Sequence, residues 1–467
     1  MDKKEYCGLF GIYGHKDAAR LVYLGLYSLQ HRGQESVGIV VSDERSVRQQ
    51  KGMGLVSEVF NNENIKLLKG HLAIGHVRYS TTGSSISKNI QPFLIEYSND
   101  YVAVGHNGNL VNAVELRRRL EKEGAIFQTT MDSEILLHLI AKSRKRNIQD
   151  RLIDALSEIK GAYSLVLLAK DQIIGVRDPN GFRPLCIGQV DGSWVLASET
   201  CALDLIQARY VREVEPGEIV FINKRGIRSV SPFPKVKHSF CIFEYIYFAR
   251  PDSNIFGHNV YLTRKRLGAA LFKEYPINAD MVLPIPDSGN CAALGFAEAS
   301  GIPFEMGIIR NHYIGRTFIQ PLQHIRDFGV KVKLNPVKEL LKGKVVVIIE
   351  DSIVRGTTSR ARVKALRDAG VKEVHMKVSC PPLRHPCYYG IDFPTKKELI
   401  AFSRSVEEIR DYIGLDSLDY LSLEGMLSSM PLPNEEFCTC CFTGIYPLPV
   451  KHKPSKYSLE RDKYKNG

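Results

Sequence analysis

The sequence predicts a chain with two different folds: a layered α+β fold first, and then an α/β fold with a doubly wound parallel sheet. Two observations support this prediction. Helices are interleaved with strand hairpins over the first half, and after that helix and strand alternate regularly. Between the two patterns lies Ser231–Lys237, SPFPKVK, whose prolines follow the last strand signal and indicate a boundary.

In the first half, helical periodicity predicts helices over Leu21–Leu29 and Asp132–Ile140. Tyr163–Leu168 and Ile173–Val176 have the composition of neighbouring strands joined by a short turn. Because helices and strand pairs both occur, we expect sheets covered by layers of helices.

The second half has six segments that alternate between helix and strand. They are Tyr261–Tyr275, Met281–Ile285, Cys291–Ala299, Lys344–Ile349, Thr358–Ala369 and Val371–Val378. The apolar, β-branched run Val345–Ile349 is typical of a strand that is buried on both faces of a parallel sheet. The segment from Pro431 contains further cysteines and a lysine-rich end, and we expect it to be an appendage.

Length and composition limit the class of protein. A chain of 467 residues is too long for one ordinary core and predicts two or three domains. No apolar run approaches the roughly 20 residues of a membrane helix, and the start MDKKEYCGLFGIYG lacks the apolar region of a secretory signal. We therefore expect a soluble cytoplasmic protein with no membrane partner; an organelle stays open if a leader has been removed.

The net charge and the cysteines indicate which kinds of ligand and which roles for the thiols are to be expected. The chain has 63 Lys and Arg against 51 Asp and Glu, which gives a net charge of +12. These basic residues are spread along the chain without an aromatic-studded stripe or zinc-finger spacing, so phosphorylated metabolites are better candidate partners than nucleic acid. The 10 cysteines, without a secretory signal, indicate reduced thiols, catalysis or metal ligation.

The stretch Val345–Ser359, VVVIIEDSIVRGTTS, has the pattern of a sugar-phosphate site. Glu350 and Asp351 come at the carboxyl end of the strand, where ligands of such sheets bind. Arg360 is expected to begin a helix whose N-terminus favours a phosphate, and the two acids would accept hydrogen bonds from ribose hydroxyls. The turn supplies hydroxyl groups and open backbone N–H groups from Ser352, Gly356, Thr357, Thr358 and Ser359. The alternative is an ordinary N-capped turn.

The form EDSIVRGTTS resembles the loop that binds phosphoribosyl pyrophosphate (PRPP) in type I phosphoribosyltransferases. It is most similar to the loop of the glutamine PRPP amidotransferases, which begin purine synthesis. The resemblance implies that Glu350, Asp351, Ser352, Gly356, Thr357 and Thr358 bind PRPP. It also implies a second, unrelated active site upstream.

Four short motifs in the first half supply candidates for that second site. Cys7, in EYCGLFGIYG, would carry a free α-amine if the chain were cleaved after Tyr6, and this amine could act as base for its own thiol. Arg78, in GHVRYS, can pair with a carboxylate, and the HNGNL motif offers oxyanion donors from Asn107 and Gly108. Asp132, in TTMDSE, can bind an amino group. The simpler alternatives, in the same order, are a buried thiol, a surface ion pair, a hairpin turn and a helix cap.

Together these motifs resemble the N-terminal nucleophile glutaminase domain of the same family, a layered αββα fold. LQHRGQES (29–36) and DPNGFRPL (178–185) match it as well. The resemblance implies that Cys7 attacks glutamine, that Asn107 and Gly108 stabilise the oxyanion, and that Arg78 and Asp132 hold the amino acid end. Arg32 matches another residue near the thiol, and MDKKEY becomes a propeptide.

The resemblance extends to the transferase site. VLPIPDS (282–288) matches the family's pyrophosphate loop, which implies that Ser288 surrounds Mg²⁺ and ribose together with Glu350 and Asp351. Arg310–Pro321, RNHYIGRTFIQP, matches the loop that closes over PRPP, with Arg316 meeting the pyrophosphate. Two positions depart from the family's KNRYVGRTF pattern, because Arg310 replaces a lysine and His312 an arginine.

The cysteines near the end of the chain form a third signal. Cys438 and Cys441 make a C-x-x-C pair, and with the distant Cys241 and Cys387 they suit either tetrahedral zinc or an iron–sulfur cluster. The resemblance is to family members in which FCIFEYIYF, HPCYYG and C-x-x-CFTG hold a [4Fe–4S] cluster. Cys440 is an extra thiol. Core positions are expected for Cys186, Cys201, Cys291 and Cys380.

We therefore predict an enzyme that transfers ammonia from glutamine to PRPP and gives 5-phosphoribosylamine, glutamate and pyrophosphate. The predicted parts are a propeptide (1–6), a glutaminase domain (7–237), a phosphoribosyltransferase domain with the cysteine segment (238–447) and a basic tail (448–467). The family further implies purine nucleotides as feedback inhibitors and a homotetramer or homodimer. Two alternatives stay open: another glutamine amidotransferase that shares only the first domain, and a PRPP-binding regulatory protein without catalysis.

Overall fold

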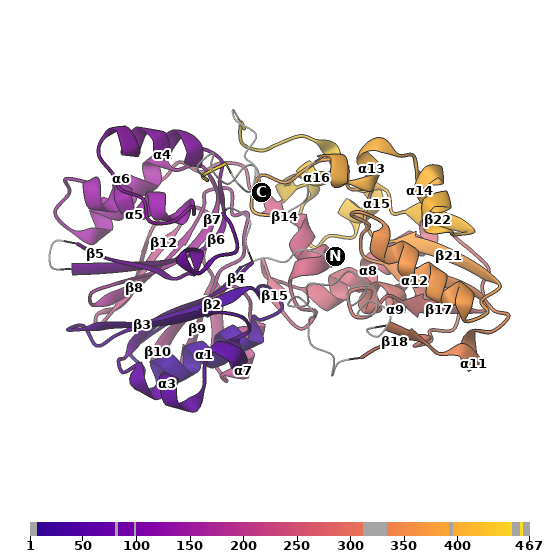
Figure 1. The fold of residues 1–467 in the computed structure, drawn as a ribbon, viewed down its shortest axis with the longest axis horizontal. Helices are drawn as coiled ribbons and strands as arrows, with labels where there is room; N and C mark the ends of the chain where they lie inside the picture. Colours follow the sequence, from indigo (N-terminus) through magenta and orange to yellow (C-terminus); the bar gives the residue numbers. More distant parts are fainter. Residues whose placement is uncertain are drawn as a thin grey trace.

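The structure is a computed structural model that describes residues 7–79, 83–97, 100–311, 334–391, 396–450 and 458–460. The chain forms two lobes, and Figure 1 shows the first in indigo and purple and the second in orange and yellow, with β14 and β15 between them. The predicted propeptide, His312 and Arg316 lie outside the described residues.

Two antiparallel sheets form the centre of the first lobe. The strands of the first sheet are, in spatial order, β11 (Arg209–Glu213), β9 (Cys186–Val190), β10 (Ser193–Ala197), β1 (Gly8–Tyr13), β4 (Leu72–Arg78), β2 (Ser36–Ser42) and β3 (Val47–Met53). Those of the second are β13 (Gly226–Val230), β12 (Ile219–Asn223), β8 (Gln172–Arg177), β7 (Gly161–Ala169), β6 (Asp100–Leu110) and β5 (Phe93–Tyr97).

Helices cover the outer face of each sheet, so the first lobe has the predicted αββα layers (Figure 1). The alternation of side chains along β1 explains the layering: Leu9 packs between the sheets, whereas Phe10 faces the helices. The first sheet is covered by α1 (Ala18–Ser28), α2 (Val56–Val59), α3 (Asn62–Leu67) and α7 (Cys201–Leu205). The second is covered by α4 (Ala113–Lys122), α5 (Ser133–Lys142) and α6 (Ile148–Glu158).

The second lobe contains a parallel sheet. Its strands are, in spatial order, β17 (Met281–Pro284), β20 (Val345–Glu350), β21 (Glu373–Val378) and β22 (Ser417–Tyr420). On the other side of β17, Phe304 forms a parallel bridge with Val282. After β17 the chain first adds Phe304 on one side of that strand and then crosses to β20 on its other side. This change of direction in strand order is the reversal that defines a doubly wound sheet. This confirms the predicted fold and puts the reversal between β17 and β20.

Helices and short elements complete the second lobe. Its helices are α8 (Val260–Glu274), α9 (Asn290–Ser300), α11 (Lys338–Leu341), α12 (Thr357–Asp368), α13 (Ile400–Ser403), α14 (Val406–Ile413), α15 (Leu423–Ser428) and α16 (Cys440–Thr443). Its short strands are β14 (Phe240–Cys241), β15 (Asn254–Ile255), β16 (His258–Asn259), β18 (Ile308–Arg310), β19 (Leu334–Pro336) and β23 (Phe437–Cys438). Single turns are η1 (Ser87–Asn89) in the first lobe and η2 (Glu244–Phe248), η3 (Lys396–Glu398) and η4 (Asn434–Glu436) here.

The helices and strands predicted from periodicity are all present, with ends within three residues of the expected ones. The phosphate turn differs in one respect, because α12 begins at Thr357 rather than at Arg360. Gly356 is the N-cap with a φ of 74°, a left-handed conformation that glycine adopts without steric cost. The hydroxyls of Thr357 and Thr358 therefore belong to the first turn of the helix.

The C-terminal cysteine segment returns to the boundary between the lobes. Its strand β23 pairs in parallel with β14, so that Cys438 lies opposite Cys241. The predicted domain boundary falls between the end of β13 at Val230 and the start of β14 at Phe240, and it stays a prediction. Among the residues that the structure describes, none of the helices combines the length and apolarity needed to span a membrane.

Candidate active sites

Cys7 directly precedes β1 and is buried, with 6% of its surface exposed. Its Sγ lies 3.6 Å from the Tyr79 carbonyl oxygen, at the end of β4. Its own carbonyl oxygen accepts a hydrogen bond from Nε of Arg32 at 3.0 Å. Burial raises the pKa of the Cys7 thiol to about 11, so at neutral pH this thiol is protonated and needs a base before it can react.

The HNGNL motif lies on β6, which crosses β1 and β4 from the opposite sheet. Gly105 allows this crossing, because a Cβ there would lie 2.9 Å from a methyl carbon of Leu9. One residue further on, the carbonyl oxygen of His106 is 3.1 Å from Nε2 of His76. Asn107 follows and is fully buried, and among the described residues neither polar atom of its side chain has a hydrogen-bond partner. A buried amide without a protein partner is costly unless it binds something else.

Arg78 and Asp132 lie in the same region as Cys7. Burial lowers the pKa of Arg78, whereas the charges of Glu35, Cys7 and Asp132 act in the opposite direction. Its Nη1 donates to Glu35 at 2.9 Å, so a substrate carboxylate would share or displace that partner. Asp132 precedes α5, but its carboxylate makes no capping bond and accepts from the Leu110 N–H at 2.9 Å.

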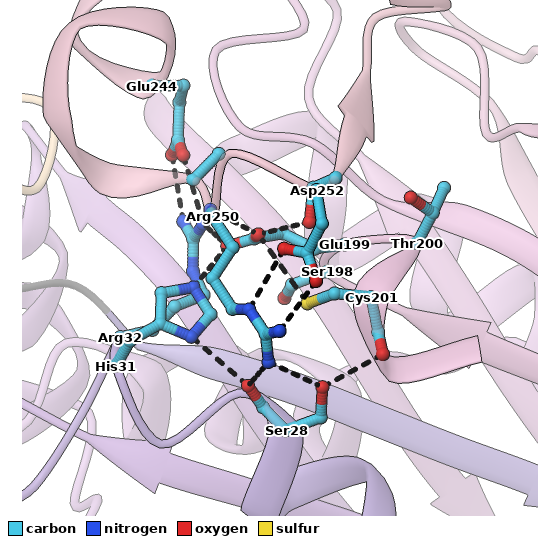
Figure 2. Close-up of polar contacts among 12 residues, drawn as sticks. Ser28, His31, Arg32, Ser198, Glu199, Thr200, Cys201, Glu244, Arg250 and Asp252 are labelled. Carbon is cyan, nitrogen blue, oxygen red and sulfur yellow. Dashed lines mark hydrogen bonds and ion pairs between the residues drawn. The ribbon is translucent and has the colours of Figure 1, made fainter. Parts of the chain in front are cut away.

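Arg32 is buried beside Cys7, and its identified partners are protein groups. Apart from the Cys7 carbonyl they are two carboxylates, Glu199 at 2.5 Å and Glu244 at 2.8 and 2.9 Å. Figure 2 shows the Arg32 guanidinium aimed at Glu244, which belongs to η2 in the second lobe. The side chain is thus a link between the two lobes.

The sugar-phosphate residues lie where the parallel sheet reverses. Glu350 and Asp351 come at the end of β20 and are both buried, and Pro284 at the end of β17 pairs with Ile349. Glu350 Oε2 accepts from Nη1 of Arg362 at 2.6 Å, and Asp351 Oδ1 accepts from the Ser352 hydroxyl at 2.7 Å. Two carboxylates at this edge form a set of oxygen donors of the kind that Mg²⁺ binds.

The two loops that follow these strands lie side by side. Gly289 shows the closeness, because a Cβ on it would be 2.4 Å from the Ile349 carbonyl oxygen. Ser288, next to it, is half-buried, as is Thr358, whereas Thr357 is exposed. The N-cap Gly356 provides no side-chain capping bond, so within the described part of the chain the first-turn N–H groups of α12 stay uncapped by a side chain. Such a helix start can bind a phosphate.

Arg310 is the one described residue at which the closing loop departs from the family pattern. Its guanidinium forms an ion pair with Asp287, one residue before Ser288. The replacement of lysine by arginine therefore keeps a cation at the edge of the pyrophosphate loop.

Five cysteines surround one small cavity. It is lined by Cys241, Cys387, Cys438, Cys440 and Cys441, together with Phe182, Arg183 and Tyr389 among others. Burial opposes ionisation of Cys387, but the Cys440 thiol and the Arg183 charge bring its pKa down to about 7. Across the described residues, no three His, Cys, Asp or Glu side chains converge on one metal ion. A cubane cluster does not need such convergence, because each thiolate binds its own iron.

The cysteine loop also touches the oxyanion strand. A Cβ on Gly390 would lie 2.9 to 3.0 Å from backbone atoms of Gly108, so the two backbones are in direct contact. Beside them, Nδ2 of Asn109 donates to the Tyr388 carbonyl at 2.9 Å. This loop of the second lobe therefore supports the strand that carries Asn107 and Gly108.

Three residues around these sites could not be predicted from the sequence: Glu199, Glu244 and Gly390. Glu244 had a weak signal, since it is the one acid inside the aromatic run FCIFEYIYF. An acid in such a run is either exposed or paired, and the sequence did not reveal its partner. Gly390 ends the matched stretch HPCYYG, but that match concerned Cys387 and gave Gly390 no role, and Glu199 had no signal. Their partners are 282 and 167 positions away.

Comparison with known proteins extends these observations. A family model described as a glutamine amidotransferase domain matches residues 76–205. Amidophosphoribosyltransferase 1 of Arabidopsis thaliana is 52% identical over 460 residues, which are 98% of this chain and 81% of that protein. The amidophosphoribosyltransferase of Bacillus subtilis is 50% identical over 451 residues, 96% of this chain and 95% of that one.

Solved structures agree over nearly the whole chain. One described as the allosteric regulatory enzyme of purine biosynthesis is 50% identical, with a TM-score of 0.91 over 96% of this chain and 97% of its own. The glutamine PRPP amidotransferase of B. subtilis with ADP and GMP is 49% identical, with a TM-score of 0.92 over 97% and 100%. The likeness includes both lobes, which decides against a relation through the first domain alone. The chain belongs to the amidophosphoribosyltransferase family, glutamine amidotransferases of purine biosynthesis.

Proposed function

We propose that Cys7 is the nucleophile that releases ammonia from glutamine and that the β17–β20 edge binds the PRPP that receives it. The observation that carries the first part is the Asn107 amide, buried without a partner among the described residues on the strand that crosses β1. An oxyanion formed at the Cys7 thiol would supply the missing hydrogen-bond acceptor.

The buried thiol needs a base, and removal of residues 1–6 would provide one. The α-amine of a free Cys7 has an ordinary pKa of about 7.7 to 8.0, so it can take the thiol proton. The sulfur then attacks the amide carbon of glutamine, and the carbonyl electrons move onto the oxygen. Asn107 and the Gly108 N–H hold that oxyanion. Collapse returns the proton to the leaving nitrogen as ammonia, and water hydrolyses the thioester to glutamate.

The amino acid end of glutamine would be held by charge. We assign its α-carboxylate to Arg78, whose planar guanidinium suits a forked contact, and its α-amino group to Asp132. Both side chains are buried near Cys7 and on different strands or helices of the first lobe. Arg32 bonds the Cys7 carbonyl, and its other identified bonds are directed to protein carboxylates.

At the second site, ammonia attacks C1 of the ribose while the bond from C1 to the pyrophosphate oxygen breaks, and the nitrogen loses a proton to give 5-phosphoribosylamine. Glu350 and Asp351 would accept from the ribose hydroxyls. Ser352, Gly356, Thr357 and Thr358 would hold the 5-phosphate at the start of α12. Arg316 is proposed for the pyrophosphate, from the sequence alone.

Magnesium fits the oxygen donors of this edge. Ser288, Glu350 and Asp351 would lie around the ion, and when bound it neutralises the charge of the departing pyrophosphate. The Arg362 guanidinium now occupies one oxygen of Glu350, so binding requires that this carboxylate be shared.

We further propose that a [4Fe–4S] cluster binds in the cysteine cavity, held by Cys241, Cys387, Cys438 and Cys441. The donor set is four thiols from three distant segments around one space, and a cluster bound there would join those segments. Cys440 lines the same cavity and would be a neighbour of the cluster rather than a ligand.

Regulation and assembly follow the family. The B. subtilis relative has been solved with ADP and GMP, and we propose purine nucleotides as inhibitors here. A homotetramer or homodimer and a cytoplasmic location remain predictions from the sequence; the Arabidopsis relative is named chloroplastic.

The test measures glutamate release with and without PRPP and Mg²⁺, on protein of known N-terminal mass and iron content. We expect release to rise when PRPP and Mg²⁺ are added, and to require Cys7 at the N-terminus. A Cys7→Ser variant should lose glutamine-dependent activity and keep the activity with added ammonia. Glutamate release that ignores PRPP, or that survives in the Cys7→Ser variant, would contradict the proposal.

A further inference from the structure

A buried group of four charged side chains joins the two lobes behind Cys7. It consists of Arg32 and Glu199 from the first lobe's sequence, Arg183 near the boundary, and Glu244 from η2 of the second lobe. All four side chains are fully shielded from solvent. Burying a charged side chain costs free energy because the charge loses its hydration, so a buried charge needs oppositely charged or hydrogen-bonding partners. Figure 2 shows three of them with the surrounding polar contacts.

Arg32 connects this group to the nucleophile. One edge of its guanidinium, through Nη1 and Nη2, forms two bonds with the Glu244 carboxylate at 2.9 and 2.8 Å. Its Nε donates to the Cys7 carbonyl at 3.0 Å. Because a guanidinium is planar and rigid, the carboxylate that orients its Nη edge also orients its Nε–H bond. Glu244 therefore helps to hold the guanidinium in the plane from which Nε reaches the Cys7 carbonyl.

Glu199 is the second carboxylate on Arg32, and the second lobe holds it as well. Its Oε1 contacts Arg32 and is 2.9 Å from Nε2 of His31. Its Oε2 accepts from the Ser253 hydroxyl at 2.7 Å and from the Arg250 backbone N–H at 2.9 Å. Both carboxylates that flank Arg32 are thus positioned by the segment that follows β14.

Glu244 is itself held from two directions. Arg183 Nη1 lies 3.3 Å from its Oε1, and Arg183 Nη2 donates to the Tyr389 carbonyl, in the cysteine loop, at 2.6 Å. In the next residue of η2, the Tyr245 carbonyl accepts from Nε of Arg264 at 2.7 Å. Arg264 is in turn within electrostatic reach of Asp351 at the sugar-phosphate edge. The element that carries Glu244 is therefore bonded to Arg32 on the Cys7 side and to Arg264, whose charge interacts with Asp351.

We propose that Glu244 is a positioning residue for the Cys7 nucleophile: through Arg32 it orients the Cys7 backbone, so that the second lobe sets the reactivity of a thiol in the first. This inference rests on the proposed role of Cys7. It predicts that a change at Glu244 impairs the glutamine reaction selectively, although the side chain touches neither substrate.

The test compares Glu244→Gln, which keeps the shape but removes the charge, with Glu244→Asp, which keeps the charge. For Glu244→Gln we expect kcat for glutamine hydrolysis to fall at least about 10-fold, with KM for glutamine changed less than about 3-fold. Inactivation of Cys7 by a diazoketone analogue of glutamine should slow by a similar factor. Activity with added ammonia should stay within about twofold, and Glu244→Asp should recover part of the loss. Rates are given per chain with Cys7 at its N-terminus and with its iron content measured.

Glu218→Gln is the matched control, since it breaks another two-bond arginine pair, Arg212 with Glu218, at 2.7 and 2.8 Å and away from Cys7. In Glu218→Gln, the rates of the glutamine reaction and of the ammonia reaction should both stay at those of the parent protein. Unchanged glutamine hydrolysis in Glu244→Gln overturns the inference, and so does a parallel loss of both activities or of iron. If Cys7→Ser still hydrolyses glutamine, the proposed nucleophile is wrong instead, and the two failures are distinguishable.

Discussion

Asn107 combines full burial with a side chain that the described protein leaves unbonded. A folded chain tolerates such an amide when a ligand completes its hydrogen bonds. An oxyanion in the transition state is a better partner than a neutral carbonyl, because it accepts stronger hydrogen bonds. The residue would therefore bind the transition state more tightly than the substrate, which is the requirement for catalysis.

We expect Asn107→Ala to lower kcat for glutamine hydrolysis by about 10² to 10³, the usual loss for one oxyanion donor. KM for glutamine should change little, and the ammonia-dependent reaction should be retained. Steady-state assays with glutamine and with ammonium salts measure both. Asn223→Ala, at the end of β12, is the control. A rise in KM at constant kcat would assign Asn107 to substrate binding instead.

Glu213 on β11 is a second residue with an unusual environment. Its carboxylate, 12% exposed, is 4.0 Å from Nη1 of Arg177, whose guanidinium lies over the rings of Phe240 and Phe256 at the lobe boundary. Burial raises the pKa of Glu213 to about 7, although the Arg177 charge acts against this. The folded protein therefore holds a proton that the unfolded chain releases near pH 4.5.

Because the pKa of Glu213 is higher in the folded protein than in the unfolded chain, Glu213 should make the protein less stable as pH rises from about 4.5 to 7. Above pH 7 its contribution should not change further. Glu213→Gln should remove that loss, and at pH 8 it should be more stable than the parent by up to about 3 kcal/mol. Thermal midpoints at pH 5 and pH 8 measure the effect. Glu218→Gln should show the opposite sign, since its neighbours lower the pKa of Glu218. A thermal midpoint that Glu213→Gln changes by the same amount at pH 5 and at pH 8 would contradict the prediction.

At the scale of elements, the loop with Cys387 and Gly390 supports β6 across the boundary. Gly390 has a φ of 102° and meets Gly108 backbone to backbone, and Asn109 bonds Tyr388 beside it. Because Gly108 is proposed as an oxyanion donor, its position depends on a loop of the other lobe.

Gly390→Ala should displace β6, since its methyl group would lie 2.9 to 3.0 Å from Gly108 backbone atoms that cannot rotate away. We expect the glutamine reaction to fall at least about 10-fold while the ammonia reaction stays within about twofold. The control is Gly414→Ala, because Gly414 has a similar φ of 86° but nothing within 4 Å. If both variants behave alike, backbone strain rather than the contact with Gly108 is responsible.

At the scale of the whole molecule, the cysteine cavity joins segments that are far apart in the chain. Cys241 follows the lobe boundary, Cys387 lies after β21, and Cys438 and Cys441 come from the C-terminal segment. A bound cluster closes long loops, and such a cross-link stabilises mainly by restricting the unfolded chain.

We expect Cys438→Ser to lose the iron and the visible absorption of the protein, and to lower the thermal midpoint by about 10 °C, as for removal of a cross-link that closes a long loop. Cys440→Ser should keep both iron and stability, because we do not assign Cys440 as a ligand. Iron analysis and thermal unfolding of the two variants give the result. Zinc in place of iron would overturn the cluster proposal, and iron loss in Cys440→Ser would overturn the ligand set.

Much of the fold and many site residues could be predicted from the sequence. Periodicity predicted the helices and strands, because an element that buries one face has apolar residues at a regular spacing along the chain. The acids after Val345–Ile349 could be predicted as a site, because the end of a buried strand is where such sheets bind ligands. The start of α12 at Thr357 was predicted only approximately: periodicity placed it at Thr358, whereas the phosphate pattern placed it at Arg360. The left-handed conformation of Gly356, which precedes the helix, is not visible in composition.

By itself, the sequence determined the order of helices and strands, the two motif sets and the cysteine pattern, because each depends on residues that are neighbours in the chain. Only the tertiary structure decided that Glu244 pairs with Arg32 behind Cys7 and that Gly390 contacts Gly108. These partners are separated by 212 and 282 positions, so no local pattern records them. A charge can be buried only where an opposite charge pairs with it, as Arg32 pairs with Glu244. Two backbones can touch only where neither carries a side chain in the way, as at Gly390 and Gly108.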